Sequence, residues 1–377
     1  MKITEIEPVL VHRWVYARVH TDEGLTGLGE AHSARKAQAM AAAIKELERP
    51  LKGRDPLDLE QNWQYAYRNS FFRGGPQVMG ALSAVDIALW DVAGKHYGMP
   101  IYRLLGGPCR RKVRVYVDAW GRSPEELAEH ASRLVKEGYT ALRLGPYTER
   151  FPDQFHAKMI DDAVARVKAV REAVGNEVDL CVEVHGRAQP YEAIALGKEL
   201  EKYRILFYED PILPENIDAM ANVAAHVNVP IATGERLYTL YEFRELLVKN
   251  AALMVRPDVC LAGGITQTKK IATLAEAFFV GVIPHNPLSP VSTAACVHID
   301  AAIHNFTIQE YSPEDRPPKS ELFQPLRLEK GYLLLPEKPG LGLDLDEKAV
   351  EKYPWDVNIY DSAPGAEFRE DGSLADS

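Results

Sequence analysis

In VDLCVEVH (178–185), ILFYED (205–210) and PIATGE (230–235), a short apolar run carries a glutamate at or near its end. The three acids, Glu183, Glu209 and Glu235, stand about 26 residues apart. That interval matches one strand-loop-helix unit, so successive parallel strands would each bring one acid to the same edge of one sheet. Three converging carboxylates at a sheet edge predict a metal site.

Polar residues continue the same rhythm farther along the chain. Asp258 ends LMVRPD, His285 ends VGVIPH and Glu310 ends NFTIQE. Six polar residues in phase at the ends of apolar runs predict an active site. Each of them taken singly also fits a structural role, such as a loop salt bridge, a packed histidine or an Asp-His pair inside the protein.

Composition limits the classes of protein to consider. The chain has 377 residues, 46% of them hydrophobic and 26% charged, and a net charge of -10. This length predicts a large barrel with a second domain, and the acidic balance argues against a nucleic-acid partner. Neither a run of eighteen apolar residues nor a signal peptide is evident, so we expect a cytoplasmic protein that does not enter membranes. The four widely spaced cysteines are expected to be reduced.

The chain is predicted to fold as an α/β protein, a (β/α)7β TIM-type barrel with an α+β N-terminal capping domain completed by the C-terminal segment. We expect the α+β module at residues 1–112, the barrel at 113–320 and the returning segment at 321–377. Two strand-like pieces and helical patterns at 36–52, 56–69 and 78–97 form the first part. The barrel strands are expected at 113–120, 141–145, 178–185, 205–210, 230–235, 253–259, 281–286 and 306–311.

The residue types indicate the chemistry of the site. Three carboxylates give a hard, oxygen-rich site that suits Mg²⁺ better than a soft metal, whereas zinc more often recruits His or Cys. His185 lies two residues beyond Glu183 and would face the same side of the strand. Asp258 and His285 end neighbouring strands, so the carboxylate would fix the tautomer of the ring and make it a general base. Glu310 would hydrogen-bond a substrate carboxylate oxygen.

Together these residues suit proton abstraction next to a carboxylate. The resulting dianion must be stabilised before a base can compete for the proton. A divalent ion that clamps the carboxylate, with a hydrogen-bonding group opposite, lowers that barrier.

The motifs also resemble a known family, the mandelate racemase subgroup of the enolase superfamily, and within it the galactonate dehydratase-like acid-sugar dehydratases. Nearly the whole chain carries the resemblance, through HTDEGLTGLGEA, FFRGGPQ, SAVDIALWDVAGKHYGMPIYRLLGG, EVHGR, FYEDPILPEN, PIATGERLY, RPDVCLAGGITQTKKIA, IPHNPLSPVSTAA and KPGLGLDLDE. The match is specific for the family and much less so for the substrate.

The resemblance implies a role for each residue of the site. Glu183, Glu209 and Glu235 would bind Mg²⁺, and the His285-Asp258 pair would remove the α-proton of a small sugar acid such as galactonate or gluconate. His185 would act as the acid that releases the β-hydroxyl as water, and Glu310 would hydrogen-bond the enediolate. The product would be a 2-keto-3-deoxy acid, and the protein would form a homo-oligomer, a dimer or an octamer.

Two positions depart from the family pattern. The family usually carries Asp where this chain has Glu183, and the extra methylene shifts the carboxylate by about 1.5 Å. The second strand ends in ALRLGP, whereas members that use a lysine base there carry Lys-x-Lys. Arg143 would be a poor base because guanidinium hardly loses its proton. The N-terminal module would close over the mouth, where Arg73 would either contact substrate or form a salt bridge that braces its loop.

Two other functions remain open. A racemase or epimerase would use His185 and His285 on opposite faces of the α-carbon of an acid sugar. A non-catalytic barrel would bind an acid or a partner, with Glu183 marking an altered metal site.

Overall fold

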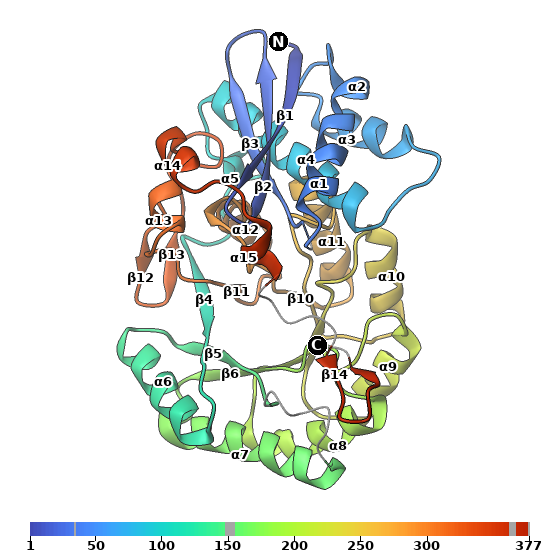
Figure 1. Cartoon of the computed structure of the whole chain (residues 1–377), viewed down its shortest axis with the longest axis vertical. Helices are drawn as coiled ribbons and strands as arrows, with labels where there is room; N and C mark the ends of the chain where they lie inside the picture. The colour runs from blue at the N-terminus through green and yellow to red at the C-terminus, as the bar shows by residue number, and fades with distance from the viewer. Residues whose placement is uncertain (34, 148–154, 362–366, 376–377) are drawn as a thin grey trace.

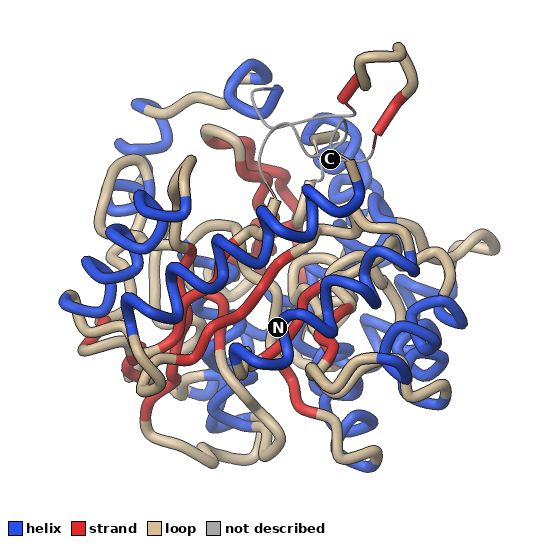
Figure 2. The backbone as a smooth tube through the Cα atoms, turned by 90° about the horizontal axis from the view of Figure 1, so that it is seen from below, coloured by secondary structure: helices blue, strands red, loops and turns tan. Residues whose placement is uncertain are grey.

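A computed structural model describes residues 1–33, 35–147, 155–361 and 367–375. The N-terminal elements cap one end of a barrel whose helices α6 to α9 lie at the opposite end of the molecule (Figure 1). The strands of the barrel lie inside and its helices outside, as the view from below shows (Figure 2). The predicted fold class is confirmed.

The cap joins an antiparallel sheet to a set of helices. Its sheet has the order β1-β2-β3, and the long helix α4 packs against β3. Gly29 of β3 permits this packing, because a Cβ there would lie 1.9 Å from the backbone oxygen of Ala84. The elements are β1 (Ile3–Val11), β2 (Trp14–Thr21), β3 (Thr26–Ala31), α1 (Ala37–Glu46), α2 (Glu48–Leu51), α3 (Leu59–Arg68), α4 (Pro76–Tyr97) and α5 (Ile101–Leu104).

The barrel alternates strands and helices as predicted. Its strands are β4 (Lys112–Asp118), β5 (Ala141–Leu144), β6 (Asp179–Glu183), β7 (Phe207–Glu209), β8 (Ile231–Thr233), β9 (Met254–Val255), β10 (Gly281–Val282) and β11 (Gln309–Glu310). They pair in parallel from β4 to β10 in chain order, β11 pairs with β4, and a bridge from Val282 to Phe306 closes the ring. The intervening helices are α6 (Pro124–Lys136), α7 (His156–Val174), α8 (Pro190–Leu200), α9 (Ile217–His226), α10 (Leu240–Val248), α11 (Gly264–Ala277) and α12 (Pro290–Ala302), and the short 3-10 helix η2 (Glu201–Tyr203) follows α8.

Strands β9 and β10 are two residues long, shorter than the predicted 253–259 and 281–286. Pro257 and Pro284 follow them, and proline has no N–H to donate to the sheet. The strand direction nevertheless continues, because a parallel bridge joins Asp258 to His285 beyond the prolines. The two residues therefore lie side by side.

Buried hydrogen bonds join the cap to the start of α11. The indole N–H of Trp63 donates to the Gly263 carbonyl at 2.8 Å, and the Gly263 N–H donates to the Ser83 hydroxyl at 2.8 Å. The Thr266 hydroxyl donates to the buried carboxylate of Asp86 at 2.6 Å. The cap is thus held on the barrel by specific polar contacts as well as by apolar packing.

The C-terminal segment returns to the cap, as predicted. The Leu341 N–H donates to Asp91 of α4 at 2.8 Å, and the His12 N–H donates to the Tyr353 carbonyl at 2.9 Å. On the way, a short hairpin pairs with β4. The elements are α13 (Lys319–Leu322), β12 (Leu328–Glu329), β13 (Tyr332–Leu334), α14 (Glu347–Lys352), α15 (Val357–Asp361), β14 (Glu367–Phe368) and β15 (Leu374–Ala375).

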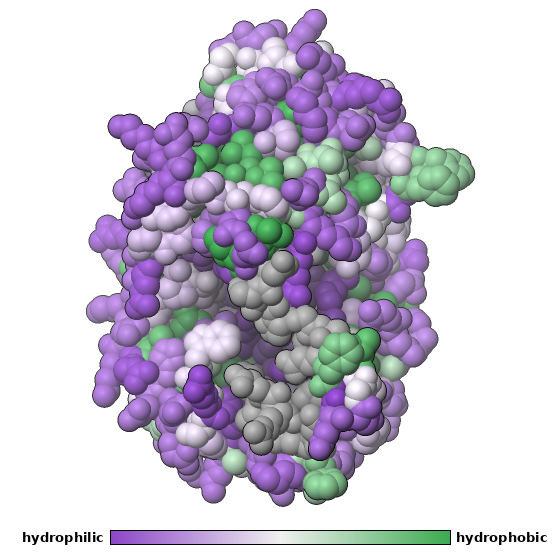
Figure 3. Space-filling view, in the orientation of Figure 1, coloured by the Kyte–Doolittle hydropathy of each residue, from purple (hydrophilic) through white to green (hydrophobic). Residues whose placement is uncertain are grey.

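The surface seen in Figure 3 is mainly hydrophilic, with hydrophobic side chains in small separate groups. Among the described residues, no helix has the length and apolar character needed to cross a membrane.

Candidate active site

The barrel mouth brings the three predicted metal-binding acids together. Glu183 ends β6 and Glu209 ends β7, where they are register partners, and Glu235 follows β8 by two residues. Each offers a carboxylate oxygen, and these oxygens lie within 4.8 Å of one another. All three side chains are buried. The even spacing of the sequence therefore does place these acids at one point.

Arg143 of β5 reaches across this cluster. Its Nη1 lies 2.9 Å from Glu209 Oε1 and 3.3 Å from Glu183 Oε2, and its Nη2 lies 2.9 Å from Glu310 Oε1. Its Nε donates to Asp118 at 2.6 Å. Burial opposes the charge of Arg143, but Asp118, Glu209 and Glu310 raise its pKa. Arg143 is therefore a fixed cation and not a base, as its residue type predicted.

Arg256 is a second cation of the site, and the sequence prediction missed it. Its side chain has no exposed surface, and its Nη2 lies 2.6 Å from Glu209 Oε1 and 2.8 Å from Glu310 Oε2. Its Nη1 donates to the Tyr116 hydroxyl at 2.7 Å. A signal was available, because Arg256 stands two residues before Asp258 and alternate residues of a strand share a face.

The three glutamates could bind a divalent cation even though two arginines lie beside them. Glu209 Oε2 and Glu235 Oε2 are buried and accept no hydrogen bond from the described residues. Burial and the charges of Glu209 and Glu235 raise the pKa of Glu183 well above its usual range. Like charges opposite each other in a sheet are unfavourable. Hard oxygen ligands with unused acceptor capacity, crowded in this way, suit Mg²⁺.

The predicted pair of Asp258 and His285 is present. His285 Nδ1 lies 2.8 Å from Asp258 Oδ2, and its Nε2 lies 3.4 Å from Glu235 Oε2. Burial acts to lower the pKa of His285, but Glu235, Glu310 and Asp258 outweigh it and raise the pKa to about 9. Burial acts to raise the pKa of Asp258, but His32 and His285 hold it below its usual range. The imidazole thus has a high affinity for a proton beside the acidic cluster.

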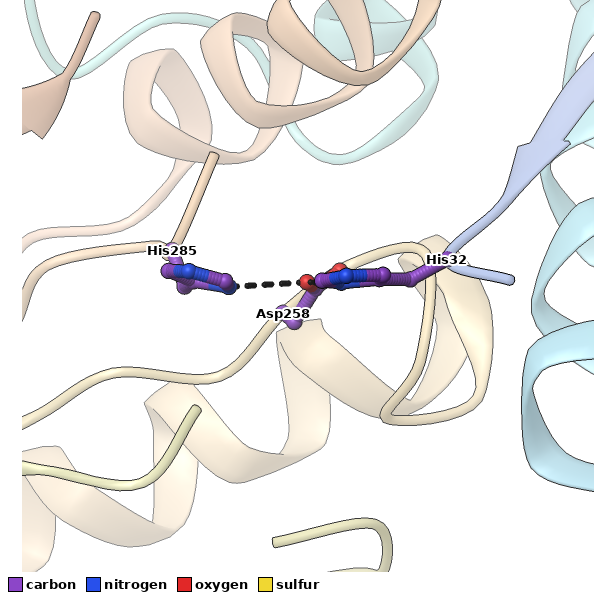
Figure 4. A group of neighbouring side chains, drawn as sticks. All are labelled: His32, Asp258 and His285. Carbon is purple, nitrogen blue, oxygen red and sulfur yellow. Dashed lines mark hydrogen bonds and ion pairs between the residues drawn. The ribbon is translucent and has the colours of Figure 1, made fainter. Parts of the chain in front are cut away.

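His32 is a further member of the site that the sequence prediction missed. It follows β3 of the cap, and its Nδ1 lies 2.6 Å from the same Asp258 oxygen that His285 contacts (Figure 4). The two rings lie 5.7 Å apart, centre to centre. Because 226 residues separate His32 from Asp258, no short-range pattern connects them. The available signal was a histidine one residue beyond the family motif HTDEGLTGLGEA.

His185 lies at the site, but in a turn after β6 and not on the strand as predicted. β6 ends at Glu183, and His185 has a positive φ of 62°, so it lies in a turn and not on the strand. The alternation of strand faces therefore does not explain its position. Its Nε2 still lies 3.9 Å from Glu235 Oε1, and 56% of the side chain is exposed. An exposed imidazole at this edge suits exchange of a proton with a bound molecule.

Glu310 lies at the end of β11 with its carboxylate among the arginines. Burial opposes its ionisation, but Arg143 and Arg256 lower its pKa below the usual range. Its Oε2 also accepts the Asn286 N–H at 3.0 Å. An ionised carboxylate only accepts hydrogen bonds. In this ionised form Glu310 would accept a hydrogen bond from a substrate hydroxyl, and its predicted hydrogen bond to the enediolate stays a prediction.

Arg73 lies on the exposed loop between α3 and α4. Its guanidinium carbon is 5.6 Å from the centre of the Tyr67 ring. Within the described ranges, neither a salt bridge that braces the loop nor a contact with the acidic cluster involves Arg73. Its contact with substrate stays a prediction.

Two families match the two parts of the chain. Residues 4–106 match the mandelate racemase / muconate lactonizing enzyme N-terminal domain, and residues 126–349 match the enolase C-terminal domain-like family. The chain belongs to the enolase superfamily. Within it, a D-galactonate dehydratase of Ralstonia pickettii is 41% identical over 93% of this chain and 94% of its own, and one of Pectobacterium atrosepticum is 37% identical over the same shares.

Solved structures agree with this assignment. An enolase of Agrobacterium radiobacter, a provisional galactarate dehydratase solved with Na and L-malate, has a TM-score of 0.94 at 33% identity over 100% of both chains. A provisional dehydratase of Salmonella enterica has a TM-score of 0.89 at 37% identity over 93% of this chain and 98% of its own. This enolase-superfamily protein is therefore an enzyme of the hydro-lyase class.

Proposed function

We propose that the enzyme dehydrates a galactonate- or gluconate-like sugar acid to a 2-keto-3-deoxy acid with the help of Mg²⁺. One observation carries the proposal. The His285-Asp258 pair lies directly beside the three-glutamate cluster, with His285 Nε2 3.4 Å from Glu235. A base next to a carboxylate-binding metal site is the arrangement that α-proton abstraction needs. The D-galactonate dehydratases among its relatives support the substrate class.

Glu183, Glu209 and Glu235 would hold the metal. When bound there, Mg²⁺ supplies positive charge next to the carboxylate of the substrate, where negative charge develops. Glu183 accepts the His185 N–H at 2.6 Å, which holds its longer side chain against the turn. The extra methylene of Glu183 is thus accommodated in the described structure.

His285 would remove the α-proton. Because Asp258 only accepts, His285 Nδ1 carries the hydrogen of their bond, and Nε2 is left to take a proton from carbon. Asp258 also stabilises the imidazolium that forms.

His185 would return a proton to the departing β-hydroxyl. His185 Nε2 lies 3.9 Å from Glu235 Oε1, whereas His285 Nε2 lies 3.4 Å from Oε2, so the two imidazoles are next to different oxygens of this glutamate. A base and an acid held apart in this way could serve α-proton removal and water loss in turn. Glu310 would accept a hydrogen bond from a substrate hydroxyl.

The same placement of His185 and His285 also supports a second function, racemisation or epimerisation. In that case one imidazole would remove the α-proton and the other would add a proton on the opposite face. Solvent deuterium would then enter the α-carbon of recovered substrate with inverted configuration and without loss of water.

A panel of aldonic and aldaric acids tests the proposal. Purified protein with Mg²⁺ is incubated with each acid, and 2-keto-3-deoxy products are measured with and without a chelator. We expect product from at least one galactonate- or gluconate-like acid and its loss on chelation. Inverted, deuterated substrate without a keto product would favour the racemase. Absence of both reactions and of stoichiometric metal would favour a non-catalytic barrel.

A further inference from the structure

Asp258 is held by residues of both domains. His285 and Cys260 come from the barrel, and His32 comes from the cap. Asp258 Oδ2 is shared by His285 Nδ1 at 2.8 Å and His32 Nδ1 at 2.6 Å, while Oδ1 accepts the Cys260 N–H at 2.7 Å. Figure 4 shows the carboxylate between the two rings. Its orientation is therefore fixed by three contacts, one of them from outside the barrel.

The hydrogen atoms of this cluster can be assigned. Asp258 has no exposed surface and lies between two imidazoles, so it serves as an acceptor for both. Each Nδ1 must then carry a hydrogen. Since both donors use one oxygen, a displacement of His32 lets the carboxylate rotate, and His285 would rotate with it.

The backbone of the cap supports the same contact. The His32 N–H donates to the Cys260 carbonyl at 3.0 Å, so one cap residue is bonded to the loop that carries Asp258 through both its backbone and its side chain. The His32 side chain is 20% exposed, whereas Asp258 is fully buried. This double attachment ties His32 of the cap directly to the loop that carries Asp258.

We propose that His32 is a positioning residue for the general base and that the working unit is a His32-Asp258-His285 triad whose third member is supplied by the cap. His32 would act through Asp258 and not by touching substrate. This inference rests on the proposed role of His285.

Kinetics of two His32 variants test the proposal. His32→Phe keeps a ring but loses the donor, and His32→Asn keeps an N–H close to the position of Nδ1. We expect His32→Phe to lower kcat, and the rate of α-proton exchange in deuterium oxide, by roughly 10- to 100-fold with little change in KM. His32→Asn should recover most of the loss. An increase in KM with unchanged kcat would place His32 against substrate and overturn the positioning role.

His20→Phe is the matched control. His20 also pairs with a carboxylate in the cap, at 3.1 Å from Glu7, but lies in β2 outside the site. Its kinetics should equal those of the wild type. An equal loss in His20→Phe would mean that any disturbed cap histidine slows the enzyme, which would contradict the proposal.

A second measurement does not need turnover. In protein with ¹⁵N-labelled histidine, NMR should show hydrogen-bonded Nδ1 protons on both His32 and His285, and His32→Phe should shift that of His285. If either Nδ1 is bare in the folded wild type, or if the His285 signal does not move, the triad is wrong. A failure to turn over any acid would instead count against the proposed function, while NMR would still decide the triad.

Discussion

At the scale of single residues, the site is built around charges that are buried together. Arg256 has no exposed surface and lies within 2.8 Å of Glu209 and Glu310. Removing one member of a buried ion pair destabilises the fold mainly because the other member is left as an unpaired buried charge. Arg256 is therefore expected to stabilise the folded structure of the barrel mouth.

Arg256→Met should lower the free energy of unfolding by about 3–5 kcal/mol, because it removes a buried cation that the carboxylates of Glu209 and Glu310 share with Arg143. Urea denaturation measures the loss. Arg244→Met is the control, since Arg244 is exposed and, among the described residues, forms its ion pair with its neighbour Glu245; it should change the stability by less than about 0.5 kcal/mol. Equal losses in the two variants would contradict the structural role of Arg256.

Glu183→Gln should weaken Mg²⁺ binding by roughly 10- to 100-fold, because a neutral amide replaces one of three negative ligands. Isothermal titration calorimetry with Mg²⁺ measures the affinity. Glu129→Gln on the exposed face of α6 should bind as the wild type does. Unchanged affinity in Glu183→Gln would remove this residue from the metal site.

At the scale of elements, close approach between the cap strand and its helix determines the geometry of the cap. Gly29→Ala would place a Cβ against the backbone of α4 and should cost about 1–3 kcal/mol by overpacking. Gly145→Ala is the control, because a Cβ there meets no described atom within 4 Å. Thermal unfolding of both variants tests the difference. Similar melting temperatures would show that β3 and α4 can move apart at little cost.

Helix α12 is joined to the cap by a buried carboxylate. Glu30 accepts bonds from the Ser289 hydroxyl at 2.6 Å and the Ser292 N–H at 3.0 Å, and burial outweighs them to raise its pKa to about 8. Between pH 5 and 8 the folded chain thus retains a proton that the unfolded chain has lost. This contribution to stability is present at low pH and is lost as the pH rises through 8.

Glu30→Gln should remove that dependence. The stability of the wild type minus that of the variant should fall between pH 5 and 8, by at most about 1.4 kcal/mol per pH unit. Urea denaturation at several pH values measures it. A constant difference would mean that Glu30 stays ionised in the fold.

The sequence predicts the elements better than their ends. The apolar runs place every barrel strand, but they do not show that prolines shorten β9 and β10 or that His185 lies in a turn. The acids of the barrel mouth follow from their spacing, because consecutive strands repeat one geometry. The positions of His32 and Arg256 do not follow from spacing. His32 reaches the site because of how the cap packs on the barrel, and Arg256 lies there because buried carboxylates need a cation.

At the scale of the whole molecule, buried polar contacts link cap and barrel, so we expect them to unfold together. Three of the five tryptophans, Trp14, Trp63 and Trp90, lie in the cap, whereas the barrel holds more of the described helical residues than the cap does. Tryptophan fluorescence and far-UV circular dichroism should therefore give coincident urea transitions. An earlier fluorescence transition would show that the cap unfolds alone. The boundaries at residues 112 and 320, and assembly into a dimer or an octamer, stay predictions.

The account depends most on the claim that His285 and the three glutamates act together on a sugar acid. The most direct measurement is the formation of a 2-keto-3-deoxy acid from D-galactonate and D-gluconate with Mg²⁺, compared between wild type and His285→Asn. We expect one product for each acid consumed by the wild type and a loss of at least about 10³-fold in the variant. Equal rates in the two proteins, or consumption without a keto product, would contradict it.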